Sequence, residues 1–216
     1  MDDPTLQNHY TAPAALPATA CVLSGGKSSR MGADKALLPY QGQALINYAL
    51  SQLSGFDEVF ISAANTDIYA FTGVPVVSDR TPNRGPIEGI AAALTAARHD
   101  HVCFRPVDTP LVPSELHELI FRAIGDFDAC VPTYGGRAEP LLGCYSKSMI
   151  AICDELANSG IRKVSAALAH ARTLEIPLDD LTSRLGDPGA YLVNANDPET
   201  FSRITAISAS PLDPKI

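Results

Sequence analysis

The chain has 216 residues, of which 46% are hydrophobic and 19% are charged, and this predicts one sizeable core rather than two ordinary domains. The formal net charge of −8 argues against a polyanion as the main partner, because nucleic-acid binding normally needs a broad basic face. No apolar run approaches the ~18 residues of a membrane span, and the N-terminus MDDPTLQNHY lacks the pattern of a secretory signal. We therefore expect a cytoplasmic protein that binds neither nucleic acid nor a membrane.

The predicted elements alternate between short apolar runs and amphipathic segments. Residues 1–19 are expected to form a loosely ordered extension, 20–206 a single domain and 207–216 a tail. Strands are predicted over 20–24, 58–63, 75–79, 101–107, 128–134 and 141–146, and helices over 43–53, 86–98, 113–124 and 198–204. The alternation predicts an α/β fold with a mostly parallel sheet and ligands at the carboxyl ends of its strands. Two runs close together around the turn YGGRAEP predict an antiparallel addition.

The stretch LSGGKSSRMGADKALL, residues 23–38, follows the first predicted strand. Gly25 and Gly26 lack side chains, so their backbone N–H groups can approach a phosphate closely. The stretch matches neither the P-loop pattern G-x-x-x-x-G-K-[ST] nor G-x-G-x-x-G. An ordinary glycine-rich loop with solvated cations, Lys27 among them, remains the alternative to a phosphate site.

Two aspartates end predicted strands. Asp108 follows HVCFRPV and Asp79 ends PVVSD, so both should lie at the edge of the sheet where sites form in such folds. Mg²⁺ binds one or two carboxylates together with substrate phosphates and waters, so Asp108 is the candidate metal ligand. A role in a turn or helix cap is the alternative for both residues.

The remaining reactive side chains show no metal or hydrolase pattern. The five cysteines include no C-x-x-C pair and are predicted to be buried thiols in a reducing compartment. The five histidines show no H-E-x-x-H spacing, and the sequence contains no G-x-S-x-G elbow.

The loop resembles the L-A-G-G…R-M-G…D-K signature of nucleotidyltransferases, and within them the chain looks most like the molybdenum cofactor guanylyltransferase family. Further similar segments follow in the family's order: VVSDRTPNRGPIEGIAAAL, PVDTPLVP, GRAEPLLGCY, SGIRKV and YLVNANDPETF. The resemblance extends from about Ala20 to Ile204. Ser24 stands where the family usually has alanine, and Val107 where it often has cysteine.

The resemblance implies a Rossmann-like three-layer nucleotidyltransferase fold and the transfer of GMP from GTP to molybdopterin with Mg²⁺ as cofactor. The implied catalytic residues are Arg30, Lys35 and Asp108, since the reaction needs cations to offset phosphate charge. Ser62 and Asn65 compete for one nucleotide contact, and Asn65 is weakly favoured. The full implied nucleotide-binding set is Leu23, Ser24, Gly25, Gly26, Lys35, Ser62, Asn65, Asp79, Gly85 and Asp108.

A second set of polar residues is expected to bind molybdopterin. Cationic side chains could hold its anionic groups and asparagines could pair with its pterin edge; these residues are Arg137, Arg162, Lys163, Asn194 and Asn196. The implied protein partners are molybdenum-cofactor biosynthesis proteins or molybdoenzymes. Two alternatives stay open: a cytidylyltransferase or other nucleotidyltransferase for a phosphorylated metabolite, and a non-catalytic nucleotide or cofactor carrier.

Overall fold

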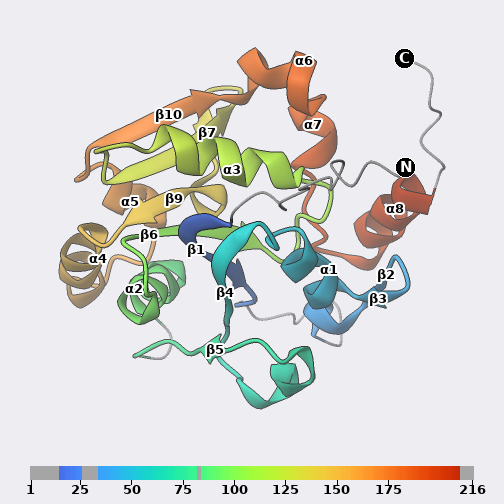
Figure 1. Ribbon diagram of the computed structural model, residues 1–216, viewed down its shortest axis with the longest axis horizontal. Coiled ribbons are helices and arrows are strands. Elements are labelled where there is room, and N and C mark those ends of the chain that lie inside the picture. Colours follow the sequence, from blue (N-terminus) through green and yellow to red (C-terminus); the bar gives the residue numbers. More distant parts are fainter. Residues whose placement is uncertain (1–14, 26–33, 82–83, 210–216) are drawn as a thin grey trace, which may run out of the picture.

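The computed structural model describes residues 15–25, 34–81 and 84–209. Its centre is an eight-stranded sheet, ordered β10-β7-β9-β6-β1-β4-β5, with β8 paired to β7 (Figure 1). The strands are β1 (Leu16–Leu23), β4 (Phe56–Ser62), β5 (Val76–Val77), β6 (His101–Pro106), β7 (Ala129–Tyr134), β8 (Arg137–Ala138), β9 (Cys144–Ser146) and β10 (Thr173–Pro177). A separate small hairpin joins β2 (Pro39–Tyr40) to β3 (Gln43–Ala44).

The sheet is mixed, as predicted. Strand β1 pairs in parallel with β4 and with β6, β4 with β5, and β7 with β10. Strand β9 is antiparallel to both β6 and β7, and β8 folds back on β7 after the turn at Gly135 and Gly136. Both glycines have positive φ, a conformation that suits a tight hairpin turn.

Helices cover both faces of the sheet, which confirms the expected three layers. They are α1 (Leu45–Ser51), α2 (Pro86–Ala96), α3 (Ser114–Ala123), α4 (Met149–Asn158), α5 (Val164–Leu168), α6 (Thr182–Leu185), α7 (Pro188–Tyr191) and α8 (Pro198–Ala209). One buried cluster includes apolar residues of α2, α4 and α5, and a second includes residues of α1 and α3. Short 3₁₀ turns add η1 (Lys35–Leu37), η2 (Asp67–Thr72), η3 (Pro140–Leu142) and η4 (Leu178–Leu181).

Several predicted boundaries differ from the structure. Strand β1 begins at Leu16, so residues 16–19 belong to the sheet and not to the N-terminal extension. Ala18 and Thr19 are fully buried, and the Leu16 N–H donates to the Gly55 carbonyl, which explains the earlier start. Helix α8 continues past its predicted end at Ile204, and the Ser208 hydroxyl contacts that of Tyr40.

Two further differences concern the second half of the chain. The predicted strand over 141–146 is divided, with η3 over Pro140–Leu142 and a strand only from Cys144. Helix α4 is absent from the predicted elements, although Met149, Cys153 and Leu156 bury one face of it. The prediction of buried thiols is confirmed for every cysteine. No helix in the described ranges is long and apolar enough to cross a membrane.

One buried charge holds the segment after β6. Arg105 is completely buried, and its guanidinium donates to the carbonyl oxygens of Thr109, Pro110 and Val112 at 3.1 to 3.3 Å. Burial lowers its pKa to about 10, so the side chain remains charged at neutral pH. These bonds fold residues 107–112 back onto the end of β6.

Replacing Arg105 should therefore destabilise the protein strongly. In Arg105→Leu three buried carbonyls lose their donor, and we expect the free energy of unfolding to fall by about 2–5 kcal/mol in urea denaturation. The matched control is Arg184→Leu, which removes an exposed ion pair with Glu115 and should cost less than about 1 kcal/mol. Equal losses in the two variants would contradict this role for Arg105.

Candidate functional site

The carboxyl ends of β1, β4, β5 and β6 lie at one edge of the sheet because these strands run parallel. The residues that follow them include most of the predicted site. Leu23 ends β1, and its carbonyl accepts the Val107 N–H at 3.0 Å. The Ser24 N–H donates to the Ser62 carbonyl at 2.8 Å. Backbone bonds thus hold the start of the glycine-rich stretch between the ends of β4 and β6.

An ion pair lies at the centre of this edge. The Lys35 ammonium is 2.7 Å from Oδ2 of Asp108, and both side chains are about four-fifths buried, with exposed fractions of 17% and 20%. The same ammonium donates to Oδ1 of Asn196 at 3.1 Å. The Ala195 N–H donates to the Asp108 carbonyl at 2.8 Å. Three predicted residues from distant parts of the chain therefore meet at one point.

A second group of predicted residues lies around the start of α2. A Cβ atom added to Gly89 would lie 3.4 Å from Oγ of Ser62 and 3.5 Å from Oδ1 of Asp79, so both side chains approach this glycine closely. Burial raises the pKa of Asp79, and the nearby Glu88 carboxylate raises it further. Ser62 is buried, whereas Asn65 is exposed and its side chain accepts the Asp67 N–H in a local turn.

Gly85 connects this group to a predicted second-substrate residue. It precedes α2 with φ at +79°, a conformation that favours glycine, and a Cβ there would lie 2.9 Å from Cβ of Arg162. Arg162 and its neighbour Lys163 are exposed beside this contact. Arg137 is also exposed but belongs to β8, in the hairpin on the far side of β9 from β6.

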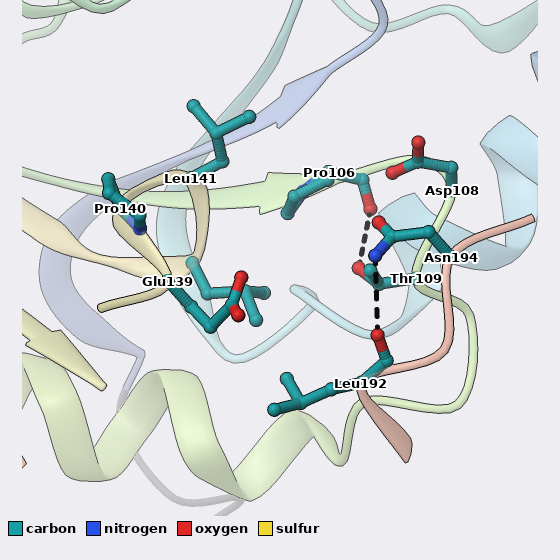
Figure 2. A pocket seen from close by; sticks show the side chains of 9 residues that line it. Pro106, Asp108, Thr109, Glu139, Pro140, Leu141, Leu192 and Asn194 are labelled. Atoms are coloured by element: carbon teal, nitrogen blue, oxygen red, sulfur yellow. Dashed lines mark hydrogen bonds between the residues drawn. The ribbon is translucent and has the colours of Figure 1, made fainter. Parts of the chain in front are cut away.

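A cavity of about 210 Å³ opens beside Asp108 (Figure 2). Its polar lining comes from Asp108, Thr109, Glu139 and Asn194, and prolines and leucines of β6, η3 and the segment before α8 form the rest. Asn194 donates a 3.3 Å hydrogen bond to the Leu192 carbonyl, which turns its side chain toward the cavity (Figure 2). The cavity therefore brings Asn194 to the same aspartate that binds Lys35.

Some predicted residues cannot be placed. Gly26, Lys27 and Arg30 lie outside the described residues. Gly25 is exposed, and a Cβ there would meet no atom of the described residues within 4 Å. In the described ranges no cluster of three or more His, Cys, Asp or Glu side chains could hold a metal. Asp108 alone provides a carboxylate at the predicted metal position.

Sequence reasoning missed a tyrosine that bridges the two flanks of the glycine-rich stretch. Tyr69 is buried in η2, and its hydroxyl donates to Oδ2 of Asp34 at 2.9 Å. Because the Tyr69 hydroxyl hydrogen is donated to Asp34, the Ser24 hydroxyl must be the donor in its 2.6 Å hydrogen bond to the Tyr69 oxygen. Burial raises the pKa of Tyr69 to about 12, so the hydroxyl keeps its proton. In the sequence, the feature that pointed to this contact was Ser24, which stands where the family usually has alanine.

A buried carboxylate and a glycine of α2 were also missed. Glu88 is 1% exposed and is paired with Arg80 at 3.0 Å, and Arg80 also contacts Asp154 of α4. Gly89 provides the close approach for Ser62 and Asp79 described above. Glu88 and Gly89 both belong to the segment GPIEGI. That segment resembles the family, but the resemblance gave neither residue an individual role.

Known proteins resemble this chain over most of its length. The sequence model of the MobA-like NTP transferase domain matches residues 20–173. A probable molybdenum cofactor guanylyltransferase of Carboxydothermus hydrogenoformans is 33% identical over 189 residues, which are 88% of this chain and 95% of the relative. A molybdenum cofactor guanylyltransferase of Cupriavidus metallidurans is 32% identical over 173 residues, or 75% and 85% of the two chains.

A solved structure has the same fold. Molybdopterin-guanine dinucleotide biosynthesis protein A of Archaeoglobus fulgidus superposes with a TM-score of 0.78 at 24% identity. The match covers 89% of this chain and 100% of the other.

The hydroxyl bridge at Tyr69 can be tested by removing one oxygen atom. Tyr69→Phe leaves the Asp34 carboxylate without this donor and separates Ser24 from Asp34, so we expect the free energy of unfolding to fall by about 1–2 kcal/mol. Nucleoside triphosphate binding, measured by calorimetry, should also weaken. Tyr134→Phe is the matched control, since the structure gives the Tyr134 hydroxyl no hydrogen bond among the described residues. Unchanged stability and affinity in Tyr69→Phe would show that the bridge has no influence.

Proposed function

Because this chain belongs to the MobA-like NTP transferase domain family, we propose that it transfers GMP from GTP to molybdopterin, forming the guanine dinucleotide cofactor and releasing pyrophosphate. The observation that carries this proposal is the contact of Lys35 with Asp108 at the edge of the sheet. It puts a cation and a carboxylate, the two charges that phosphate transfer needs, between two candidate substrate regions.

The chemical difficulty of this reaction is charge. A phosphate of the acceptor attacks the α-phosphorus of GTP, so two anions must approach while negative charge grows on the departing pyrophosphate. Lys35 is suited to offset that charge as a compact ammonium group. Arg30, whose guanidinium suits forked contacts with phosphate oxygens, stays a prediction. The acceptor phosphate is already ionised at neutral pH, so no histidine base is needed.

Asp108 is the residue that we expect to hold Mg²⁺. Its carboxylate uses Oδ2 for Lys35 and is one-fifth exposed, and it borders an open cavity, which fits a metal bound by one carboxylate plus phosphates and water. When bound, Mg²⁺ would offset phosphate charge and orient the triphosphate. The backbone bonds from Ala195 and the Arg105 network keep Asp108 in position for this role.

The two substrates are assigned to the two sides of Asp108. Ser62 ends β4, Asp79 follows β5 and Gly85 precedes α2, and with the glycine-rich stretch they form the proposed GTP side. Molybdopterin is assigned to the opposite side, where the cavity contains Asn194. Asn196 contacts Lys35 and therefore lies between the two regions. Arg162, Lys163 and Arg137 remain proposed contacts for anionic groups of the acceptor.

The function can be tested with purified protein, Mg²⁺, molybdopterin and GTP labelled at the α-phosphate. We expect label to enter the dinucleotide product, and equimolar unlabelled GTP, but not CTP, ATP or UTP, to compete with it. Preferential use of CTP would support the cytidylyl alternative. GTP binding without turnover of any acceptor would support the carrier.

Two variants separate the roles of the ion pair. Asp108→Asn removes the proposed metal ligand, and we expect kcat to fall by about 10²–10³-fold and the Mg²⁺ concentration for half-maximal rate to rise. Lys35→Met breaks the same ion pair but keeps the carboxylate, so it should raise KM for GTP and lower kcat without raising the Mg²⁺ requirement. Asp180→Asn, an exposed residue of η4, is the control. An equal change in Mg²⁺ requirement in both ion-pair variants would contradict a metal role for Asp108.

A further inference from the structure

The cavity beside Asp108 contains one carboxylate that no predicted role explains. Glu139 lies between β8 and η3, and its backbone N–H donates to the Pro132 carbonyl at 2.9 Å, which fixes the start of its side chain. Figure 2 shows the carboxylate directed into the cavity, on the side that faces Thr109 and Leu192. Glu139 therefore approaches the cavity from the side opposite Asn194.

This carboxylate has no internal partner in the part of the chain that the structure describes. The other partly or fully buried glutamates have partners: Glu88 pairs with Arg80, Glu115 pairs with Arg184, and Glu58 accepts hydrogen bonds from Thr19 and Arg98. Burial raises the pKa of Glu139, since no donor compensates the loss of water. A partly buried carboxylate without a donor has lost some of its hydration, so a ligand that supplies N–H groups would gain by binding there.

The shape and lining of the cavity restrict that ligand. Pro140, Leu142 and Leu192 add apolar surface to the lining of the same cavity, and such surface suits the faces of a flat ring. At about 210 Å³ the cavity is smaller than the ~300–1,000 Å³ of sites for drug-sized ligands, and so suits a bicyclic head group. A carboxylate accepts two parallel hydrogen bonds best from adjacent N–H donors.

We propose that Glu139 determines acceptor specificity by accepting hydrogen bonds from the ring N–H and the exocyclic amino group of the pterin. The apolar residues contact the faces of the ring, and Asn194 contacts its far side. The phosphate of the acceptor then extends toward Asp108 and Lys35. This inference rests on the proposed function, because that function makes the acceptor a pterin.

Guanine has the same pair of neighbouring donors, so the position of the cavity decides between the two rings. In the sheet, β9 and β7 lie on one side of β6, and β1, β4 and β5 lie on the other. Glu139 and η3 belong to the β7–β9 side, whereas Ser24, Ser62 and Asp79 belong to the β1–β4–β5 side. The geometry therefore favours the pterin over the guanine as the ring that reaches Glu139.

Steady-state kinetics of Glu139→Gln test this assignment. Glutamine keeps the size of the side chain but replaces one acceptor oxygen by an N–H donor that faces the pterin amino group. We expect KM for molybdopterin to rise about ten- to hundred-fold, and KM for GTP to stay within two-fold of wild type. The shift in melting temperature caused by GTP should also be unchanged, which would separate lost recognition from misfolding. Glu175→Gln, an exposed glutamate of β10, is the matched control and should behave as wild type.

Other outcomes overturn the proposal in distinguishable ways. An unchanged KM for molybdopterin would show that Glu139 does not recognise the acceptor. A rise in KM for GTP alone would assign Glu139 to the guanine instead. If the wild-type enzyme failed to label molybdopterin but labelled another acceptor, the proposed function would be wrong. The role of Glu139 is tested only by comparing Glu139→Gln with a wild-type enzyme that does label molybdopterin.

Discussion

The parallel pairing of β1 with β4 on one side and β6 on the other is the constraint from which the candidate site follows. Hydrogen bonding fixes the register from Thr19 to the last residue of β1, Leu23, which lies opposite Ser62 and Pro106. The chain continues from these three positions into the glycine-rich stretch, the segment toward β5 and the segment of Asp108. A slip of one residue would turn each side chain to the other face of the sheet and separate the groups that now meet.

Irregular segments need additional anchors, because no ladder of hydrogen bonds holds them. Arg105 holds the segment after β6 through three carbonyls, and Tyr69 connects Ser24 with Asp34. Both anchors are buried polar groups with defined partners. In a low-dielectric interior such bonds are strong and specific in geometry, whereas an apolar contact would tolerate sliding. The position of Asp108 thus depends on Arg105, which is itself completely buried.

Much of this arrangement could be predicted from the sequence. Runs such as HVCFRPV are buried on both faces and short, which indicates parallel strands, and the β/α alternation then places Ser62 and Asp108 at one edge. The contact of Lys35 with Asp108 does not follow from that topology, because Lys35 lies in η1, outside the sheet. Helix α4 was missed although Ser148, a residue type that commonly begins helices, is its N-cap; the Ser148 side chain makes no capping hydrogen bond.

Contacts between distant side chains could not be predicted in this way. Tyr69 lies in a 3₁₀ segment without a clear apolar period, so nothing local indicates that its hydroxyl reaches Asp34. Glu139 resembles any charged residue next to a turn, and its importance depends on a cavity formed by three segments. Residue type and spacing indicate which edge of a sheet a group occupies, whereas packing decides what it touches.

The ion pair of Lys35 and Asp108 also has a thermodynamic consequence. Each group is the counter-ion of the other, so a cation that takes the carboxylate releases the ammonium, and a phosphate that takes the ammonium releases the carboxylate. Each event lowers the free-energy cost of the other, and linkage requires the benefit to be equal in both directions. In the proposed function, this one ion pair would couple the binding of the metal to the binding of the phosphate.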